Sequence, residues 1–535
     1  DPDYGISAAN KGKYLAFTEK GTTTPNGSKT GIDHLIELGV THVHLLPTFD
    51  YRSIDETKLE NNSFNWGYDP QHFNVPEGSY SSDPYDGNVR INEFKQMVMA
   101  LHDAGIAVVM DVVYNHTGAS ADSDFSKIVP GYYYRFNPNG SFSNGSGTGN
   151  ETASERAMMR RYLIDSVKYW VQEYHIDGFR FDLMALHDIE TMAMLKDELE
   201  AINPNILIYG EGWTGGGSPL PDEQKALKKN VSQLNDIAVF SDDLRDAIKG
   251  HVFTKTDKGF VNGGQGLEES LKFGIVASVL HGDVDYPSVK YSKFAYATSP
   301  TQIVSYVEAH DNLTLWDKLV ITNPEASVEE LIKMHRMANA IVLTSQGIPF
   351  IHAGADFLRT KGGNENSYNA PDSVNRLDWS RKDEFQSNVD YIAGFIALRK
   401  AHPAFRMTTA ADVKTNLNFI ETGTPNVVAY TLDNNANGDD WETIAVLVNA
   451  NETEVQVTLA ESGWVVVANG EKAGVTKLAD IGSKTITIPA QTLMVLVDSD
   501  SYYGFNWTLV YLVGAAVLIG AGLAYYFLVH KKKHA

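Results

Sequence analysis

Four short segments of the sequence contain residues that can transfer protons or attack carbon. They are "DVVYNH" (111–116), "GFRFD" (178–182), "GEGW" (210–213) and "EAHDN" (308–312). Asp182, Glu211 and Asp311 place one carboxyl group in each of three segments. Hydrolysis of a glycosidic bond uses such groups, one as an ionised nucleophile and one as a proton donor. Their surroundings must differ if one is to be charged and the other neutral near pH 7.

The neighbours of two of these carboxyl groups fit such a division of roles. Arg180 precedes Asp182 by two residues, so both side chains point to one face of an extended strand, where the guanidinium holds Asp182 ionised. Glu211 lies between glycines and is followed by Trp213, an apolar aromatic neighbour that would raise the pKa of the Glu211 carboxyl. A structural ion-pair network is the alternative, but polar ends on four separate segments favour catalysis.

A repeated strand–helix pattern must bring these segments together. Apolar strands alternate with helical patterns from about residue 30 to 400, which favours an α/β fold of the (β/α)8 TIM-barrel type, with the polar strand ends at its catalytic face. Seven strands are predicted, at 42–47, 106–113, 178–182, 206–211, 237–242, 302–311 and 348–354. The segment before Gly31 reads as a loop. We therefore expect the first barrel strand to be missing, which leaves two unpaired edges.

The pattern changes after residue 403, where short alternating strands separated by Asn, Gly and Asp predict an antiparallel β-sandwich domain. Beyond it, an uncharged apolar run is long enough to cross a bilayer and precedes a basic tail, which predicts a C-terminal transmembrane helix. The expected domains are the catalytic barrel 1–403, the sandwich 404–498, a linker 499–506, the transmembrane helix 507–529 and a cytoplasmic tail 530–535.

This organisation predicts an extracellular protein anchored in the cell membrane by its C-terminal helix. An export signal is then required, and since none is visible we expect the N-terminus to be incomplete. The formal net charge of -23 excludes a nucleic-acid surface, which needs clustered Lys and Arg, but suits a neutral sugar. The 535 residues include no cysteine, so there is no disulfide, thiolate metal site or cysteine nucleophile.

Taken in order, the four segments resemble the conserved regions of the α-amylase superfamily, glycoside hydrolase family 13. The resemblance implies Asp182 as the nucleophile, Glu211 as the general acid/base and Asp311 as the transition-state stabiliser. Asn364 and Tyr368, in a strand-end loop, are candidates for contacts to further sugar units. The full set of expected substrate-binding residues is Tyr68, Asp111, His116, Arg180, Trp213, His310, Asn364 and Tyr368.

Other segments resemble the type I pullulanases more closely. "FNWGYDP" (64–70) looks like their signature, with Phe64 in place of the usual tyrosine, and Tyr68 matches the aromatic residue that stacks on the scissile sugar. The segments 242–250 and 357–379 also look like that family, whereas Ala185 replaces a usual glycine. The resemblance extends from residue 1 to about residue 498, and the chain start resembles the segment just after the first barrel strand of the family.

We therefore expect a debranching glycoside hydrolase that cleaves α-1,6-glucosidic bonds in pullulan, amylopectin and limit dextrins with retention. The alternatives are an α-1,4-acting amylase or neopullulanase-like hydrolase, and a non-catalytic surface protein that binds glucan or a partner. No cofactor is required and no metal ligand is assigned. Asn115 resembles a calcium ligand of related amylases, but no acidic partners cluster with it in the sequence, and His42 and His44 read as structural.

Overall fold

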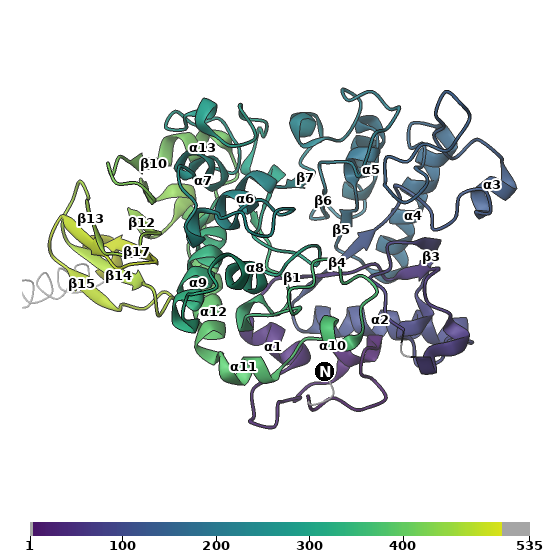
Figure 1. Cartoon of the computed structure of the whole chain (residues 1–535), viewed down its shortest axis with the longest axis horizontal. Helices are drawn as coiled ribbons and strands as arrows, with labels where there is room; N and C mark the ends of the chain where they lie inside the picture. Colours follow the sequence, from purple (N-terminus) through teal and green to yellow (C-terminus); the bar gives the residue numbers. More distant parts are fainter. Residues whose placement is uncertain (1–3, 62, 505–535) are drawn as a thin grey trace, which may run out of the picture.

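The fold is built around a seven-stranded parallel sheet (Figure 1). The computed structural model describes residues 4–61 and 63–504. The strands, in their order across the sheet, are β1 (His42–Leu45), β4 (Ala107–Val112), β5 (Gly178–Phe181), β6 (Leu207–Gly210), β7 (Ala238–Phe240), β8 (Ile303–Ser305) and β9 (Ile348–Pro349). Every neighbouring pair is parallel. Each strand lies within the range predicted from the sequence.

The two edges of this sheet, β1 and β9, are not paired with each other in the described residues. Both edges line one cavity of about 1300 Å³. Its walls are largely apolar and include Val43, Leu45, Ile348 and Phe350. In the described part of the chain the sheet is therefore open along the line where an eighth strand would close a barrel.

The longer helices pack around the sheet because each presents an apolar face to it. In α2, the predicted face of Phe94, Met97, Val98 and Leu101 is buried, and the Asp86 side chain caps the helix by accepting from the backbone N–H of Asn88. The helices up to residue 401 are α1 (Gly31–Leu38), α2 (Gly87–Asp103), α3 (Asp124–Ile128), α4 (Ala157–Tyr174), α5 (Ile189–Glu200), α6 (Asp242–Lys249), α7 (Glu268–Ile275), α8 (Leu315–Thr322), α9 (Val328–Thr344), α10 (Asp372–Asn375), α11 (Ser380–Glu384) and α12 (Gln386–Ala401).

A short antiparallel hairpin, β2 (Phe49–Tyr51) and β3 (Pro70–Pro76), interrupts the strand–helix repeat between β1 and α2. The "FNWGYDP" segment is the approach to β3, so the hairpin fixes where Tyr68 lies. The hairpin packs against the segment after β4 through Phe49 and Phe73, whose rings contact each other and the ring of Tyr114.

The C-terminal sheet domain, residues 417–498, lies at the end of the molecule remote from β5 and α4 (Figure 1). Its main sheet has the order β10-β11-β12-β17-β14-β15, and β13 pairs with β16 separately. The strands are β10 (Leu417–Ile420), β11 (Val427–Leu432), β12 (Ile444–Asn449), β13 (Val455–Thr458), β14 (Trp464–Ala468), β15 (Ala479–Ile481), β16 (Thr485–Ile488) and β17 (Thr492–Asp498), preceded by α13 (Ala410–Asn416) and followed by α14 (Ser499–Tyr503).

Both faces of the six-stranded sheet are buried, which explains its continuous apolar runs. Alternate residues of β12 belong to different cores: Val446 packs in the core shared with the barrel helices, and Leu447 packs in a smaller core with Ile486 and Ile488 of β16. The predicted sandwich is therefore unequal, six strands against two, because the barrel covers much of the larger sheet.

The predicted transmembrane helix requires a correction. Residues 507–529 lie outside the described residues, and within 4–61 and 63–504 no helix is long and apolar enough to cross a membrane. The longest described helix, α4, has 18 residues but carries Arg160, Arg161, Asp165 and Lys168. The predicted fold class was wrong in including a membrane-spanning helix, and the membrane partner predicted from it is likewise unsupported.

Candidate active site

Arg180 forms the centre of a buried charge network at the carboxyl ends of three adjacent strands. Its Nη1 atom lies 2.8 Å from Oδ1 of Asp111 and 2.9 Å from Oδ1 of Asp182, and its Nη2 atom lies 2.6 Å from Oε1 of Glu211. The Arg180 side chain is only 3% exposed. The parallel register places Asp111 of β4 directly beside Arg180 of β5, so the two side chains meet across the sheet.

One guanidinium cannot neutralise three carboxylates, so their protonation states differ. Burial alone opposes the ionisation of Asp111, but the charge of Arg180 and the hydrogen bond from His44 lower the pKa of Asp111 to about 2. Burial raises the pKa of Glu211 to about 8, opposed by Arg180 and reinforced by the negative charge of Asp182. The short Arg180–Glu211 contact would suit an ion pair, but we assign a neutral Glu211 because Asp111 and Asp182 share the same cation.

Further contacts fix the direction of each carboxyl group. The side-chain amide of Asn115 donates to Oδ2 and to the backbone carbonyl of Asp182, both at 2.8 Å. The backbone N–H of Leu183 donates to Oε2 of Glu211 at 2.9 Å. Asp311 follows β8 at the exposed mouth of the site. Partial burial and the negative charge of Asp182 raise the pKa of Asp311. Contact with solvent keeps this rise small.

An aromatic wall adjoins the network. The Tyr68 hydroxyl donates to Oδ2 of Asp111 at 2.7 Å, and Arg180 lies over the Tyr68 ring at 5.7 Å. The His310 ring stacks on Tyr68 with centroids 5.1 Å apart and meets Trp66 edge-on at 4.8 Å. Nε2 of His116 is 2.8 Å from the carbonyl oxygen of Tyr68. Burial lowers the pKa of both histidines, so both rings are neutral at pH 7.

The structure thus brings together eight of the eleven predicted site residues: Asp111, Asp182, Glu211, Asp311, Tyr68, His116, Arg180 and His310. The other three lie further out. Trp213 packs against an apolar cluster that includes Tyr209 and Phe240. Tyr368 is 43% exposed, and its backbone carbonyl accepts from Trp66. Asn364 lies in the loop after Lys361, and its side chain accepts from the backbone of Asn366.

Comparison with known proteins agrees with this geometry. The family model of the α-amylase catalytic domain matches residues 18–130 of the sequence, and the family model of the pullulanase all-beta domain matches residues 413–472. The solved pullulanase of Paenibacillus barengoltzii, in complex with maltohexaose and α-cyclodextrin, is 47% identical with a TM-score of 0.86, over 94% of this chain and 75% of that chain. The chain belongs to the type I pullulanase family.

The chain is shorter than these pullulanases. The Bacillus subtilis pullulanase is 44% identical over 447 residues, which are 84% of this chain and 61% of the relative. The solved type I pullulanase of B. subtilis with maltose is 40% identical, with a TM-score of 0.86 over 93% of this chain and 69% of that chain. The chain therefore spans about three fifths of the first relative and somewhat more of the two solved structures.

Sequence reasoning missed three supporting residues of this site. His44 read as structural, yet its Nε2 lies 3.2 Å from Oδ2 of Asp111, and its Nδ1 lies 3.0 Å from the Tyr209 hydroxyl. Asn115 suggested a calcium ligand, but it holds Asp182. Lys361 donates to the backbone carbonyl of His310 at 2.8 Å and lies over Trp66. His44 lies inside an apolar strand and Asn115 follows one. A polar residue at such a position was the signal that could have identified both as supporting residues.

In the described residues, one cluster of three carboxylates has the spacing of a cation site. It does not include Asn115. It comprises Asp50, Glu56 and Glu77. Arg90 forms an ion pair with this cluster, because its Nη2 atom lies 2.7 Å from Oε2 of Glu56. Both Glu77 oxygens accept backbone N–H groups, and burial raises the Glu77 pKa to about 7. Glu77, with its pKa raised to about 7, and Glu56, already paired with Arg90, are poor calcium ligands, so these residues do not fit the ion.

Proposed function

We propose that this chain is the catalytic part of a glucan debranching enzyme that hydrolyses α-1,6-glucosidic bonds in pullulan, amylopectin and limit dextrins. Membership of the pullulanase family supports the reaction class, and relatives solved with maltose and maltohexaose support an α-glucan ligand. The observation that carries the proposal is the pairing of Asp182 with a carboxyl group, Glu211, whose pKa is about 8, on one guanidinium. Glycoside hydrolysis needs this combination of an ionised and a neutral carboxyl group.

The proposed mechanism retains the configuration of the anomeric carbon. Glu211 gives its proton to the glycosidic oxygen while an oxygen of Asp182 attacks C1, which breaks the C1–O bond and forms a β-glycosyl enzyme. Glu211, now ionised, takes a proton from water, whose oxygen attacks C1 and releases Asp182. Asp311 accepts hydrogen bonds from sugar hydroxyls as positive charge builds at C1. The ring of Tyr68 faces the apolar side of the scissile sugar.

The remaining predicted residues take supporting roles in this proposal. Asp111 and His116 fix Arg180 and Tyr68 and line the position of the scissile sugar with His310. Trp213, Asn364 and Tyr368 lie further out and suit glucose units on either side of it. The predicted extracellular location stays a prediction.

Product analysis on pullulan tests the reaction directly. Cleavage of its α-1,6 bonds gives maltotriose, whereas an α-1,4-acting relative gives panose. Binding of pullulan without release of reducing ends would instead favour a non-catalytic glucan-binding protein. Glu211→Gln and Asp182→Asn should each lower turnover by about 10²- to 10⁴-fold or more. Turnover near that of the wild type in either variant would overturn the assignment.

A further inference from the structure

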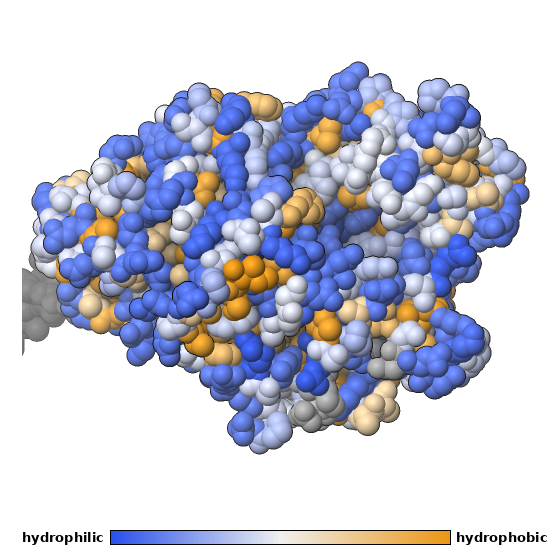
Figure 2. All heavy atoms as spheres, in the orientation of Figure 1, coloured by the Kyte–Doolittle hydropathy of each residue, from blue (hydrophilic) through white to orange (hydrophobic). Residues whose placement is uncertain are grey.

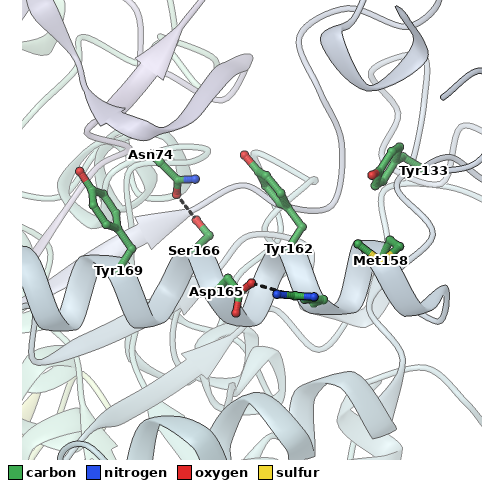
Figure 3. Close-up of a pocket in the computed structure, with 8 residues that line it drawn as sticks. Asn74, Tyr133, Met158, Tyr162, Asp165, Ser166 and Tyr169 are labelled. Carbon is green, nitrogen blue, oxygen red and sulfur yellow. Dashed lines mark hydrogen bonds and ion pairs between the residues drawn. The ribbon is translucent and has the colours of Figure 1, made fainter. Parts of the chain in front are cut away.

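A second pocket lies along α4 (Figure 3). It has a volume of about 550 Å³. Its walls come from β3, from the loop that follows α3 and from α4, and none of the proposed site residues lines it. The lining residues are Asn74, Tyr133, Met158, Arg161, Tyr162, Asp165, Ser166 and Tyr169.

Three tyrosine rings form a row along this pocket. Figure 3 shows Tyr169, Tyr162 and Tyr133 on the same side of α4. Tyr162 and Tyr169 are seven residues apart, which places them two turns, or about 10 Å, apart along the helix. The row is long enough for a short oligosaccharide to contact more than one ring.

Neighbouring aromatic residues hold these rings in place. The Tyr133 ring stacks on Phe125 with centroids 4.6 Å apart, and the Tyr162 ring meets Phe125 edge-on at 5.0 Å. Tyr169 packs edge-on against Trp170 at 5.7 Å. Rings that are already fixed lose little conformational entropy when a ligand binds, so they favour binding.

Three polar groups of the pocket can still bind a ligand. Ser166 donates to Oδ1 of Asn74 at 2.5 Å, which directs the Asn74 amide nitrogen into the space between Tyr169 and Tyr162 (Figure 3). In the described residues no hydrogen bond engages that nitrogen or the hydroxyls of Tyr162 and Tyr133. An amide donor and two hydroxyls are thus free to bind the hydroxyl groups of a ligand.

The charges of the pocket favour a neutral ligand. Arg161 and Asp165 pair with each other at 3.2 Å and are 71% and 62% exposed on the rim, so they leave no net charge. A phosphate or carboxylate ligand would find no unpaired cation in the lining and would meet a chain of net charge -23. A sugar chain, with apolar ring faces and uncharged hydroxyl edges, matches this lining.

We propose that this pocket is a second binding site for an α-glucan chain, which holds a polymeric substrate on the protein at a place separate from the catalytic site. The choice of an α-glucan rests on the proposed function. A sugar site at this pocket is supported independently of the proposed function. Its support is the fixed aromatic rings, the free amide and hydroxyl groups and the neutral lining.

The test measures glucan binding separately from hydrolysis. In a Glu211→Gln background, migration through gels that contain amylopectin reports binding of the whole chain. Tyr133→Ala combined with Tyr169→Ala should weaken this binding by about 2- to 10-fold, since two aromatic contacts are lost. Tyr162→Phe keeps the ring and its packing and should weaken binding less. Tyr85→Ala, which removes a 76% exposed tyrosine outside the pocket, is the matched control and should bind normally.

In the active protein, the double variant should lower kcat/KM on amylopectin by a similar factor and leave it unchanged on a short branched oligosaccharide. Unchanged activity on the short substrate also shows that the variant is folded. Unaltered amylopectin binding by both the double variant and Tyr162→Phe would overturn the proposal. If the wild type binds amylopectin through this pocket but releases no maltotriose from pullulan, the second site stands and the proposed function fails.

Discussion

Replacing Glu211 with glutamine should stabilise the folded protein at neutral pH while it removes the proposed proton donor. Glutamine resembles the neutral carboxyl group in shape, but it has one accepting oxygen, so it keeps the hydrogen bond from either Leu183 or Arg180 and turns its NH2 group toward the other donor. That loss is the same at every pH. In the wild type, burial raises the Glu211 pKa to about 8, against an ordinary value of 4.5. The folded state must therefore keep a group neutral that ionises freely in the unfolded chain, and this lowers the free energy of unfolding.

The size of the effect follows from linkage. A raised pKa in the folded state means that stability is fully present below the ordinary value, pH 4.5, and is lost as pH rises toward 8. Each pH unit in this window costs ~1.36 kcal/mol, so the wild type loses about 3 kcal/mol by pH 7. Glutamine has no proton to lose, so Glu211→Gln avoids this loss. Relaxation of the buried network and the lost hydrogen bond reduce the figure, and a gain of about 1–2 kcal/mol at pH 7 is expected.

Chemical denaturation of the wild type and Glu211→Gln at pH 5, 7 and 8.5 measures this difference. It should be small at pH 5 and grow toward pH 8.5. Glu190→Gln is the matched control, because Glu190 is 71% exposed and pairs with Arg160 on the surface, so its effect should stay within about 0.5 kcal/mol at each pH. A stability difference between Glu211→Gln and the wild type that does not change from pH 5 to 8.5 would refute a neutral, buried Glu211.

Two further predictions follow from the same structure. Because Glu211 must be protonated to act as an acid and its pKa is about 8, kcat/KM on pullulan should fall about tenfold between pH 7 and 9, and a fall complete by pH 6 would contradict this. At Gly394 of α12, an added Cβ would lie 2.1 Å from the Ala473 carbonyl oxygen, so Gly394→Ala should lower stability by about 1–3 kcal/mol in thermal unfolding. Gly87→Ala, where an added Cβ meets nothing within 4 Å, is its control and should not destabilise.

The strands of the barrel could be predicted from the sequence because each is a local pattern. The run 106–113 is apolar except for Asp111, which is typical of a strand buried on both faces, and α2 before it repeats apolar residues at helical spacing. The transmembrane prediction used the same local logic on the run 507–529. That run lies outside the described residues. Within them no helix is both long and apolar enough to span a membrane, so the predicted fold class was wrong on this point.

The site could be predicted only as far as single strands determine it. Period-two alternation places Arg180 and Asp182 on one face, and their 2.9 Å contact agrees with that. The contacts of Arg180 to Asp111 and Glu211 depend instead on the register of β5 against β4 and β6, where Arg180 lies opposite Asp111 and Tyr209. Register depends on the packing of the whole sheet, so no pattern within one strand reveals it.

The cause of the raised Glu211 pKa shows the same limit. The sequence pointed to Trp213 as the apolar neighbour of Glu211, whereas the structure attributes the shift to burial and to the charge of Asp182, with Trp213 packed in a separate cluster. The direction was predictable from the chemistry that the site must perform. Its source was not, because burial results from strands far apart in the sequence.

The sharing of one cation also explains how a neutral Glu211 can release its proton. Asp111, whose pKa is lowered to about 2, and Asp182 both contact the one cation Arg180, so the carboxyl groups outnumber the cation, which in the proposed mechanism favours the positive charge that develops at C1. As Glu211 gives up its proton it becomes a carboxylate 2.6 Å from Nη2 of Arg180, and this contact stabilises the new charge. Burial thus keeps the proton on Glu211 before the reaction, and Arg180 limits the cost of transferring it.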